Sequence, residues 1–213
     1  MEDEIKKKNM IKNIIFDWSG VLSNDLIPVY RASMLVFKKL GKEPISLEEY
    51  KREFTLPYMV FWNKYFPELT KEEEDKLFLK EINLVDEPKS FPNVKKILKF
   101  LKQKNIKLAI LSSHPQEKLE KEIKDYKFQK FFLEINGSVH DKIETIIKIM
   151  KRNNFNPNET AYVGDMTHDI KAGKKAKVIT IAVSWGYQPK EKLLKENPKF
   201  LINDLKELNK LIQ

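Results

Sequence analysis

Three aspartates follow apolar runs at two distant places in the chain. Residues 14–16 (IIF) precede Asp17, and residues 160–163 (TAYV) precede Asp165, with Asp169 four positions later. An unbroken apolar run is typical of a strand buried in a parallel sheet. The carboxyl ends of parallel strands lie at the same edge of a sheet, so both segments bring carboxylates to that edge. Ligands bind at this edge in open parallel sheets. Mg²⁺ prefers oxygen ligands, so the sequence predicts a Mg²⁺ site there.

The elements that must position these acids alternate between strands and helices over most of the chain. Strands are predicted at about 11–16, 107–111, 131–135, 160–164, 178–183 and 199–202, with helical patterns between them from residue 93 onward. Such alternation predicts a mostly parallel sheet with helices on both faces. We therefore predict an α/β, Rossmann-like three-layer core made of residues 1–23 and 88–213.

Residues 24–87 have apolar side chains at helical spacing and no convincing strand. Ser46 is placed as an N-cap with Glu49 three positions later, which is the pattern of a capping box, and Thr70 precedes another helix. Aromatic residues in this segment recur at helical spacing and are expected to form its own core. An all-helical insertion after the first strand predicts a cap above the strand ends.

Composition limits the kind of protein. The 213 residues are 41% hydrophobic, carry a net charge of +9 and include no cysteine, so disulfides and thiolate chemistry are excluded. The lysines alternate with glutamates, which is typical of solvated helix faces and not of a nucleic-acid-binding stripe. The start of the chain lacks the apolar stretch of a signal peptide. We expect a cytoplasmic protein with no nucleic-acid or membrane partner; the oligomeric state stays open.

Four motifs, in chain order, resemble those of the haloacid dehalogenase superfamily: FDWSGVL, LAILSS, a lone lysine after the next loop, and VGDMTHDIKAGKKA. The stretch AVSWGYQPKEKLL is similar to the phosphoglycolate phosphatase-like branch, which inserts a helical cap after the first motif. The resemblance implies a Mg²⁺-dependent phosphohydrolase that acts on a small phosphorylated metabolite.

The resemblance also implies a role for each acid. Asp17 would attack phosphorus and form an aspartyl phosphate, which divides one difficult displacement into two easier ones. Mg²⁺ would be held by Asp17, by the main-chain carbonyl of Ser19 and by Asp165, and Asp169 would support this metal shell or orient the lysine. The structural alternative is that Asp17 and Asp165 are plain helix N-caps, which are common for Asp after a strand.

Phosphate binding is implied for residues at the two middle motifs. Ser112 would donate a hydrogen bond to a phosphoryl oxygen, with the adjacent Ser113 as the alternative, and either serine could be a simple helix cap. Lys142 would place a positive charge against nucleophile and phosphate. We prefer Lys142 to Lys148 because it lies just before a helix, although Ile143 follows it where the family usually has proline.

Ser19 departs from the family pattern, which usually has an Asp two residues after the nucleophile. That Asp protonates the leaving oxygen and then deprotonates water; a serine hydroxyl does neither well, and losing such a group forfeits roughly 10²–10⁴-fold in rate. Three alternatives follow. The substrate has a good leaving group, such as an acyl phosphate; the aspartyl phosphate is long-lived; or the chain is a catalytically weak phosphate-binding or regulatory protein.

Other side chains could compensate for this serine. His114, His140 and His168 each lie beside a motif, and an imidazole that titrates near neutral pH could replace the missing acid, although loops at strand ends are polar in any case. A phosphonatase-like hydrolase is a further alternative, because that branch has a small residue at this place. It needs a lysine in the cap, where Lys64 is the nearest candidate and has the pattern of a solvated helix residue.

Overall fold

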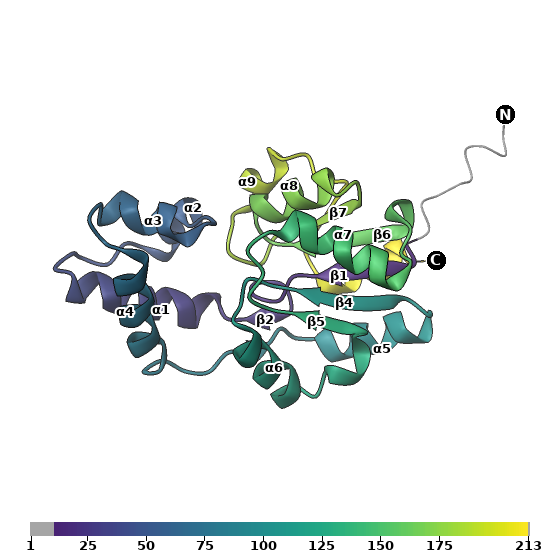
Figure 1. Ribbon diagram of the computed structural model, residues 1–213, viewed down its shortest axis with the longest axis horizontal. Coiled ribbons are helices and arrows are strands. Elements are labelled where there is room, and N and C mark those ends of the chain that lie inside the picture. Colours follow the sequence, from purple (N-terminus) through teal and green to yellow (C-terminus); the bar gives the residue numbers. More distant parts are fainter. Residues whose placement is uncertain (1–10, 213) are drawn as a thin grey trace.

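The computed structural model describes residues 11–212 and arranges them around a parallel six-stranded sheet, so residues 1–10 of the predicted core and Gln213 lie outside the described residues (Figure 1). The strand order is β5-β4-β1-β6-β7-β8, and every pairing in this sheet is parallel. The strands are β1 (Asn13–Phe16), β4 (Lys107–Leu111), β5 (Glu134–Asn136), β6 (Thr160–Gly164), β7 (Ile179–Val183) and β8 (Phe200–Ile202). The predicted α/β, Rossmann-like fold is confirmed.

β1 lies between the two strands that carry the other site motifs. Phe16 pairs with Ile110 of β4 on one side and with Val163 of β6 on the other. Every residue of β1 and β6 is buried, which explains their unbroken apolar sequence. The Asp17 amide extends the pairing by donating to the Val163 carbonyl (2.9 Å). Asp17 is therefore held at the centre of the sheet edge.

Helices cover both faces of this sheet, in three layers (Figure 1). On one face α5 (Val94–Gln103), α6 (Gln116–Asp125) and α10 (Leu208–Leu211) pack against β1 residues such as Ile14 and Phe16. On the other face α7 (Lys142–Asn153) and α8 (Thr167–Lys175) pack against Ile15, and α9 (Lys190–Leu194) packs beside α8. Ile15 faces opposite to Ile14 and Phe16 because side chains alternate along a strand. In residues 11–212, no helix combines the length and the hydrophobicity that crossing a bilayer requires.

A helical segment interrupts the core between two very short strands. β2 (Ser23–Asn24) and β3 (Lys89–Ser90) pair antiparallel, and between them lie α1 (Leu26–Lys39), α2 (Leu47–Glu53), α3 (Tyr58–Tyr65) and α4 (Lys71–Ile82). These four helices form a body beside the sheet (Figure 1). Its core is aromatic and includes Phe37, Tyr50, Phe61 and Trp62. A cap made of residues 24–87 stays a prediction.

Side-chain caps start two of these helices where the sequence predicts them. The Ser46 hydroxyl accepts from the Glu49 amide (3.1 Å), but the Glu49 carboxylate accepts from the Tyr65 hydroxyl (3.1 Å) and does not complete a capping box. At Thr70 the box is complete, because the Glu73 carboxylate accepts from the Thr70 amide (3.0 Å). The competition from Tyr65 is a tertiary contact that local spacing does not reveal.

Candidate active site

Three carboxylates meet at the carboxyl edge of the sheet. Asp17 follows β1, Asp165 follows β6 and Asp169 lies in the first turn of α8, and one oxygen from each lies within 4.8 Å of the others. All three side chains are buried. The structure thus brings together the three acids that the sequence places at two strand ends.

Lys142 joins two of these acids. Its Nζ donates to Asp17 Oδ2 and to Asp169 Oδ1, both at 2.6 Å, and the side chain is buried. Lys142 is the first residue of α7, and the Asp141 carboxylate before it caps the helix. Lys148 instead forms an exposed pair with Glu144.

Backbone groups hold the remaining carboxylate oxygens in place. One oxygen of each acid accepts from a backbone amide: Asp17 Oδ1 from Trp18 (2.6 Å), Asp165 Oδ2 from Tyr187 (2.6 Å) and Asp169 Oδ2 from Met166 (3.0 Å). Two glycines make room for Asp165, since a Cβ at Gly20 or Gly186 would lie 2.2 Å from Asp165 Oδ2. The acids are therefore pre-oriented before any ligand binds.

The charges at this site do not balance, because three carboxylates face one ammonium. Burial, opposed by Lys142 and reinforced by Asp169, raises the pKa of Asp17 from 3.8 to about 6. Burial and the two neighbouring carboxylates raise the pKa of Asp165 well above its ordinary value. Burial alone would lower the pKa of Lys142, but Asp169 and Asp17 raise it, so the ammonium keeps its proton. A buried, electron-rich set of hard oxygen donors fits Mg²⁺.

The two candidate phosphate-binding serines differ in their surroundings. Ser112 follows β4, is buried, and its hydroxyl accepts from the His114 amide (3.2 Å). Ser113 is exposed. The parallel register places the end of β4 beside Asp17, so Ser112 is the serine at the edge of the sheet where the acids lie.

Ser19 lies in a tight loop, and a second acid approaches that loop. The Gly20 amide donates to Asp25 Oδ1 (3.0 Å), and Asp25 is buried. Burial raises the pKa of Asp25 to about 6, against the opposing effect of a hydrogen bond from Ser19. The sequence analysis missed Asp25, because it precedes α1 without belonging to any motif.

The side chains considered as replacements for the missing acid lie in different places. His114 Nε2 is 3.2 Å from Glu122 Oε1, although the contact is off the direction of a hydrogen bond. His140 is exposed, and burial lowers the pKa of His168 on α8. Lys64 pairs with Glu53 (2.5 Å) on the exposed side of α3.

Comparisons with known proteins agree with this architecture. The family model described as haloacid dehalogenase-like hydrolase matches residues 14–183. The chain is 31% identical to a candidate pyrophosphatase, PpaX, of Clostridium perfringens, over 96% of this chain and 98% of the relative. It is 23% identical to a phosphoglycolate phosphatase of Synechococcus elongatus, over 89% of this chain and 91% of the relative.

Solved structures share the fold. A haloacid dehalogenase-like family hydrolase from Streptococcus pneumoniae superposes with a TM-score of 0.82 at 21% identity, over 95% of this chain and 99% of that one. The chain therefore belongs to the haloacid dehalogenase-like hydrolases, as its four motifs indicate. It is a phosphatase of that type, and the resemblance to the phosphoglycolate phosphatase-like branch is confirmed.

Proposed function

We propose that this chain is a Mg²⁺-dependent phosphohydrolase that passes the phosphoryl group of a small cytoplasmic metabolite to Asp17 and then to water. The observation that supports it most is Lys142, whose buried ammonium lies 2.6 Å from both Asp17 and Asp169. A plain N-cap or a structural carboxylate would not need a buried cation and two further acids within 4.8 Å.

Each side chain then has one task in the reaction. Asp17 Oδ2 attacks phosphorus and the bond to the leaving oxygen breaks, which leaves a phosphoryl group on the carboxylate; water attacks this group in the second step. Lys142 reduces the repulsion between the carboxylate and the anionic phosphate, and Ser112 donates a hydrogen bond to a phosphoryl oxygen. Both groups act where charge accumulates during transfer.

The Mg²⁺ site would use the acids already described. Asp17, Asp165 and the main-chain carbonyl of Ser19 would hold the ion, with Asp169 supporting them and fixing Lys142. When bound, Mg²⁺ supplies positive charge that lets a carboxylate approach a phosphate dianion. Burial, together with repulsion from Asp169 and Asp17, raises the pKa of Asp165, and a bound cation would offset both effects.

The leaving group determines which phosphates suit this site. A serine at position 19 cannot protonate a strongly basic alkoxide, whereas phosphate and carboxylate leave as stable anions without a proton. One relative is named a candidate pyrophosphatase, and its substrate would have such a leaving group. We therefore propose that pyrophosphate or an acyl phosphate is hydrolysed faster than an alkyl phosphate such as phosphoglycolate.

A panel assay tests this function. Phosphate release with Mg²⁺ is measured for pyrophosphate, acetyl phosphate, p-nitrophenyl phosphate, phosphoglycolate and sugar phosphates, with wild type, Asp17→Asn and Ser19→Asp. We expect turnover by wild type, none by Asp17→Asn, and a gain for alkyl phosphates in Ser19→Asp. Equal turnover by wild type and Asp17→Asn would refute the proposed nucleophile.

The second candidate is a catalytically weak protein that binds phosphate. It is favoured by Ser19 and by the burial of Asp17. In that case wild type releases no phosphate from any compound in the panel, binds inorganic phosphate, and gains turnover in Ser19→Asp. The phosphonatase-like alternative has less support, because Lys64 lies on the exposed side of α3 and pairs with Glu53.

A further inference from the structure

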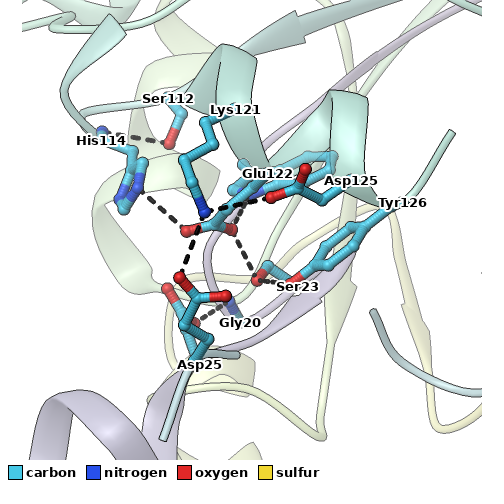
Figure 2. A network of polar contacts seen from close by, with 11 residues as sticks. Gly20, Ser23, Asp25, Ser112, His114, Lys121, Glu122, Asp125 and Tyr126 are labelled. Carbon is cyan, nitrogen blue, oxygen red and sulfur yellow. Dashed lines mark hydrogen bonds and ion pairs between the residues drawn. The ribbon is translucent and has the colours of Figure 1, made fainter. Parts of the chain in front are cut away.

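A polar network joins α6 to the loops after β1 and β4, and its α6 residue Glu122 belongs to none of the four motifs (Figure 2). At its centre is Glu122, whose side chain is only 16% exposed. Glu122 Oε2 accepts from the Trp18 indole Nε1 (2.7 Å) and from the Ser23 hydroxyl (3.0 Å). The sequence around Glu122 has the pattern of a solvated helix, so its spacing gives no sign of this role.

Trp18 and Ser23 are the two ends of the loop that carries Ser19. The Trp18 carbonyl closes this loop by accepting from the amides of Val21, Leu22 and Ser23 at 2.9–3.2 Å. One carboxylate oxygen of Glu122 thus fixes both ends of the loop. The same residue bears on the nucleophile, because the Trp18 amide donates to Asp17 Oδ1 (2.6 Å).

The other oxygen of Glu122 faces the loop after β4. Glu122 Oε1 lies 3.2 Å from Nε2 of His114, and the His114 amide donates to the Ser112 hydroxyl (3.2 Å). A single carboxylate therefore contacts both the loop after β1 and the loop after β4. The proposed nucleophile, Asp17, lies on the loop after β1, and the proposed phosphate-binding residue, Ser112, lies on the loop after β4.

Two further features suit Glu122 to this task. Tyr126, one turn later on α6, stacks on the Trp18 ring at 5.6 Å between centroids, and its hydroxyl lies 3.2 Å from the Ser23 hydroxyl. Burial would raise the pKa of Glu122, but the contacts from His114, Trp18 and Ser23 outweigh it and lower the pKa. The side chain is therefore an ionised acceptor, which makes shorter and stronger hydrogen bonds than a neutral one.

We propose that Glu122 is a positioning residue that holds the loop from Trp18 to Ser23 against the loop from Ser112 to His114. It does not touch the phosphoryl group; it fixes the two loops whose separation the in-line attack depends on. The proposal rests on the proposed phosphoryl transfer to Asp17. A misplacement of about 1 Å at such a site can cost roughly 10²-fold in rate.

The test compares Glu122→Ala and Glu122→Gln with Glu117→Gln, a matched control on an exposed residue of the same helix. Amide hydrogen exchange is measured on peptides that cover 17–23 and 112–116, and kcat and KM are measured well below the melting temperature. Glu122→Ala should speed exchange in both loops at least about 10-fold and lower kcat about 10–100-fold, with KM changed less than about 3-fold. Glu122→Gln keeps an acceptor oxygen and should fall between Glu122→Ala and wild type.

Unchanged exchange in both loops would overturn the proposal, whatever the activity. So would a variant that melts at a lower temperature but retains the wild-type kcat when folded, because Glu122 would then be only structural. If Glu122→Ala does not fold, Glu122→Gln decides the question by the same readouts. If wild type hydrolyses nothing, the proposed function fails, while the exchange measurement still tests the link between the loops.

Discussion

Lys142 brings a positive charge to the buried acids of this site. Its ammonium is the cation between Asp17 and Asp169, and its helix begins at that residue. The preference for Lys142 over Lys148 rests on its place before a helix, and the structure gives the two lysines opposite surroundings, since Lys148 is exposed and pairs with Glu144. Local sequence could separate these lysines because one lies at a helix start and the other lies within the helix.

Removing that cation should impair catalysis, whereas removing an exposed lysine of the same helix should not. Lys142→Met leaves Asp17 and Asp169 without their shared cation, so we expect kcat to fall roughly 10²–10³-fold, as for the loss of one group that stabilises developing charge. Lys148→Met is the matched control and should keep wild-type kcat. Steady-state kinetics with circular dichroism checks both variants; full activity of folded Lys142→Met would contradict its role.

The raised acid pKa values give a defined pH dependence. In the metal-free protein the pKa of Asp17 is about 6 against an ordinary 3.8, so the folded state binds the proton more tightly. Its contribution to stability is present below pH 3.8 and is lost as pH rises through 6. Mg²⁺ held by Asp17 would compete with this proton, so we expect the increase in Tm on adding Mg²⁺ to grow from pH 5 to pH 7.5.

Asp165→Asn provides the control for that titration. It removes one of three repelling carboxylates but keeps an acceptor for the Tyr187 amide. We expect a higher metal-free Tm at pH 7.5, by about 2–4 °C for each kcal/mol of relieved repulsion, and little response to Mg²⁺. A wild-type response to Mg²⁺ in Asp165→Asn would place the ion elsewhere.

At the scale of elements, the regular strands and helices of the core were predictable from the sequence. Very short elements, and those whose position depends on tertiary packing, were not. The strands at 107–111 and 160–164 agree with the structure because their apolar runs end at clear boundaries. The predicted strand at 131–135 is instead a 3₁₀ turn over Gln129–Phe131 followed by β5, since Phe131 packs into the core from that turn. The two-residue strands β2 and β3 are too short to show any periodicity.

Gln188 links the core to the helical segment, and its substitution tests that link. Its buried amide accepts from the Thr167 amide at the start of α8 (2.8 Å) and donates to the Phe54 carbonyl at the end of α2 (3.0 Å). Gln188→Ala leaves both groups without this partner, which should cost about 1–3 kcal/mol in the free energy of unfolding. Urea titration measures it, with exposed Gln103→Ala unchanged; an equal loss in both would contradict the link.

Across the whole molecule, the motifs were predictable and the residues that support them were not. Asp17, Lys142, Asp165 and Asp169 come from distant segments, and parallel strand ends bring them together. Glu122 contacts Trp18 across 104 positions, and no local pattern marks such a partner. Asp25 and the Tyr187 amide were missed for the same physical reason: they act through contacts that only the folded chain creates.

The covalent step on Asp17 is the claim on which the rest depends, and acid quenching tests it directly. Wild type and Mg²⁺ are mixed with excess acetyl phosphate, quenched in acid within milliseconds to minutes, and mapped by peptide mass spectrometry. We predict one phosphoryl group on Asp17 that accumulates in wild type, because Ser19 cannot activate water, and that accumulates less in Ser19→Asp. Steady phosphate release with no phosphoryl group on Asp17 at any time, and undiminished release by Asp17→Asn, would contradict the account.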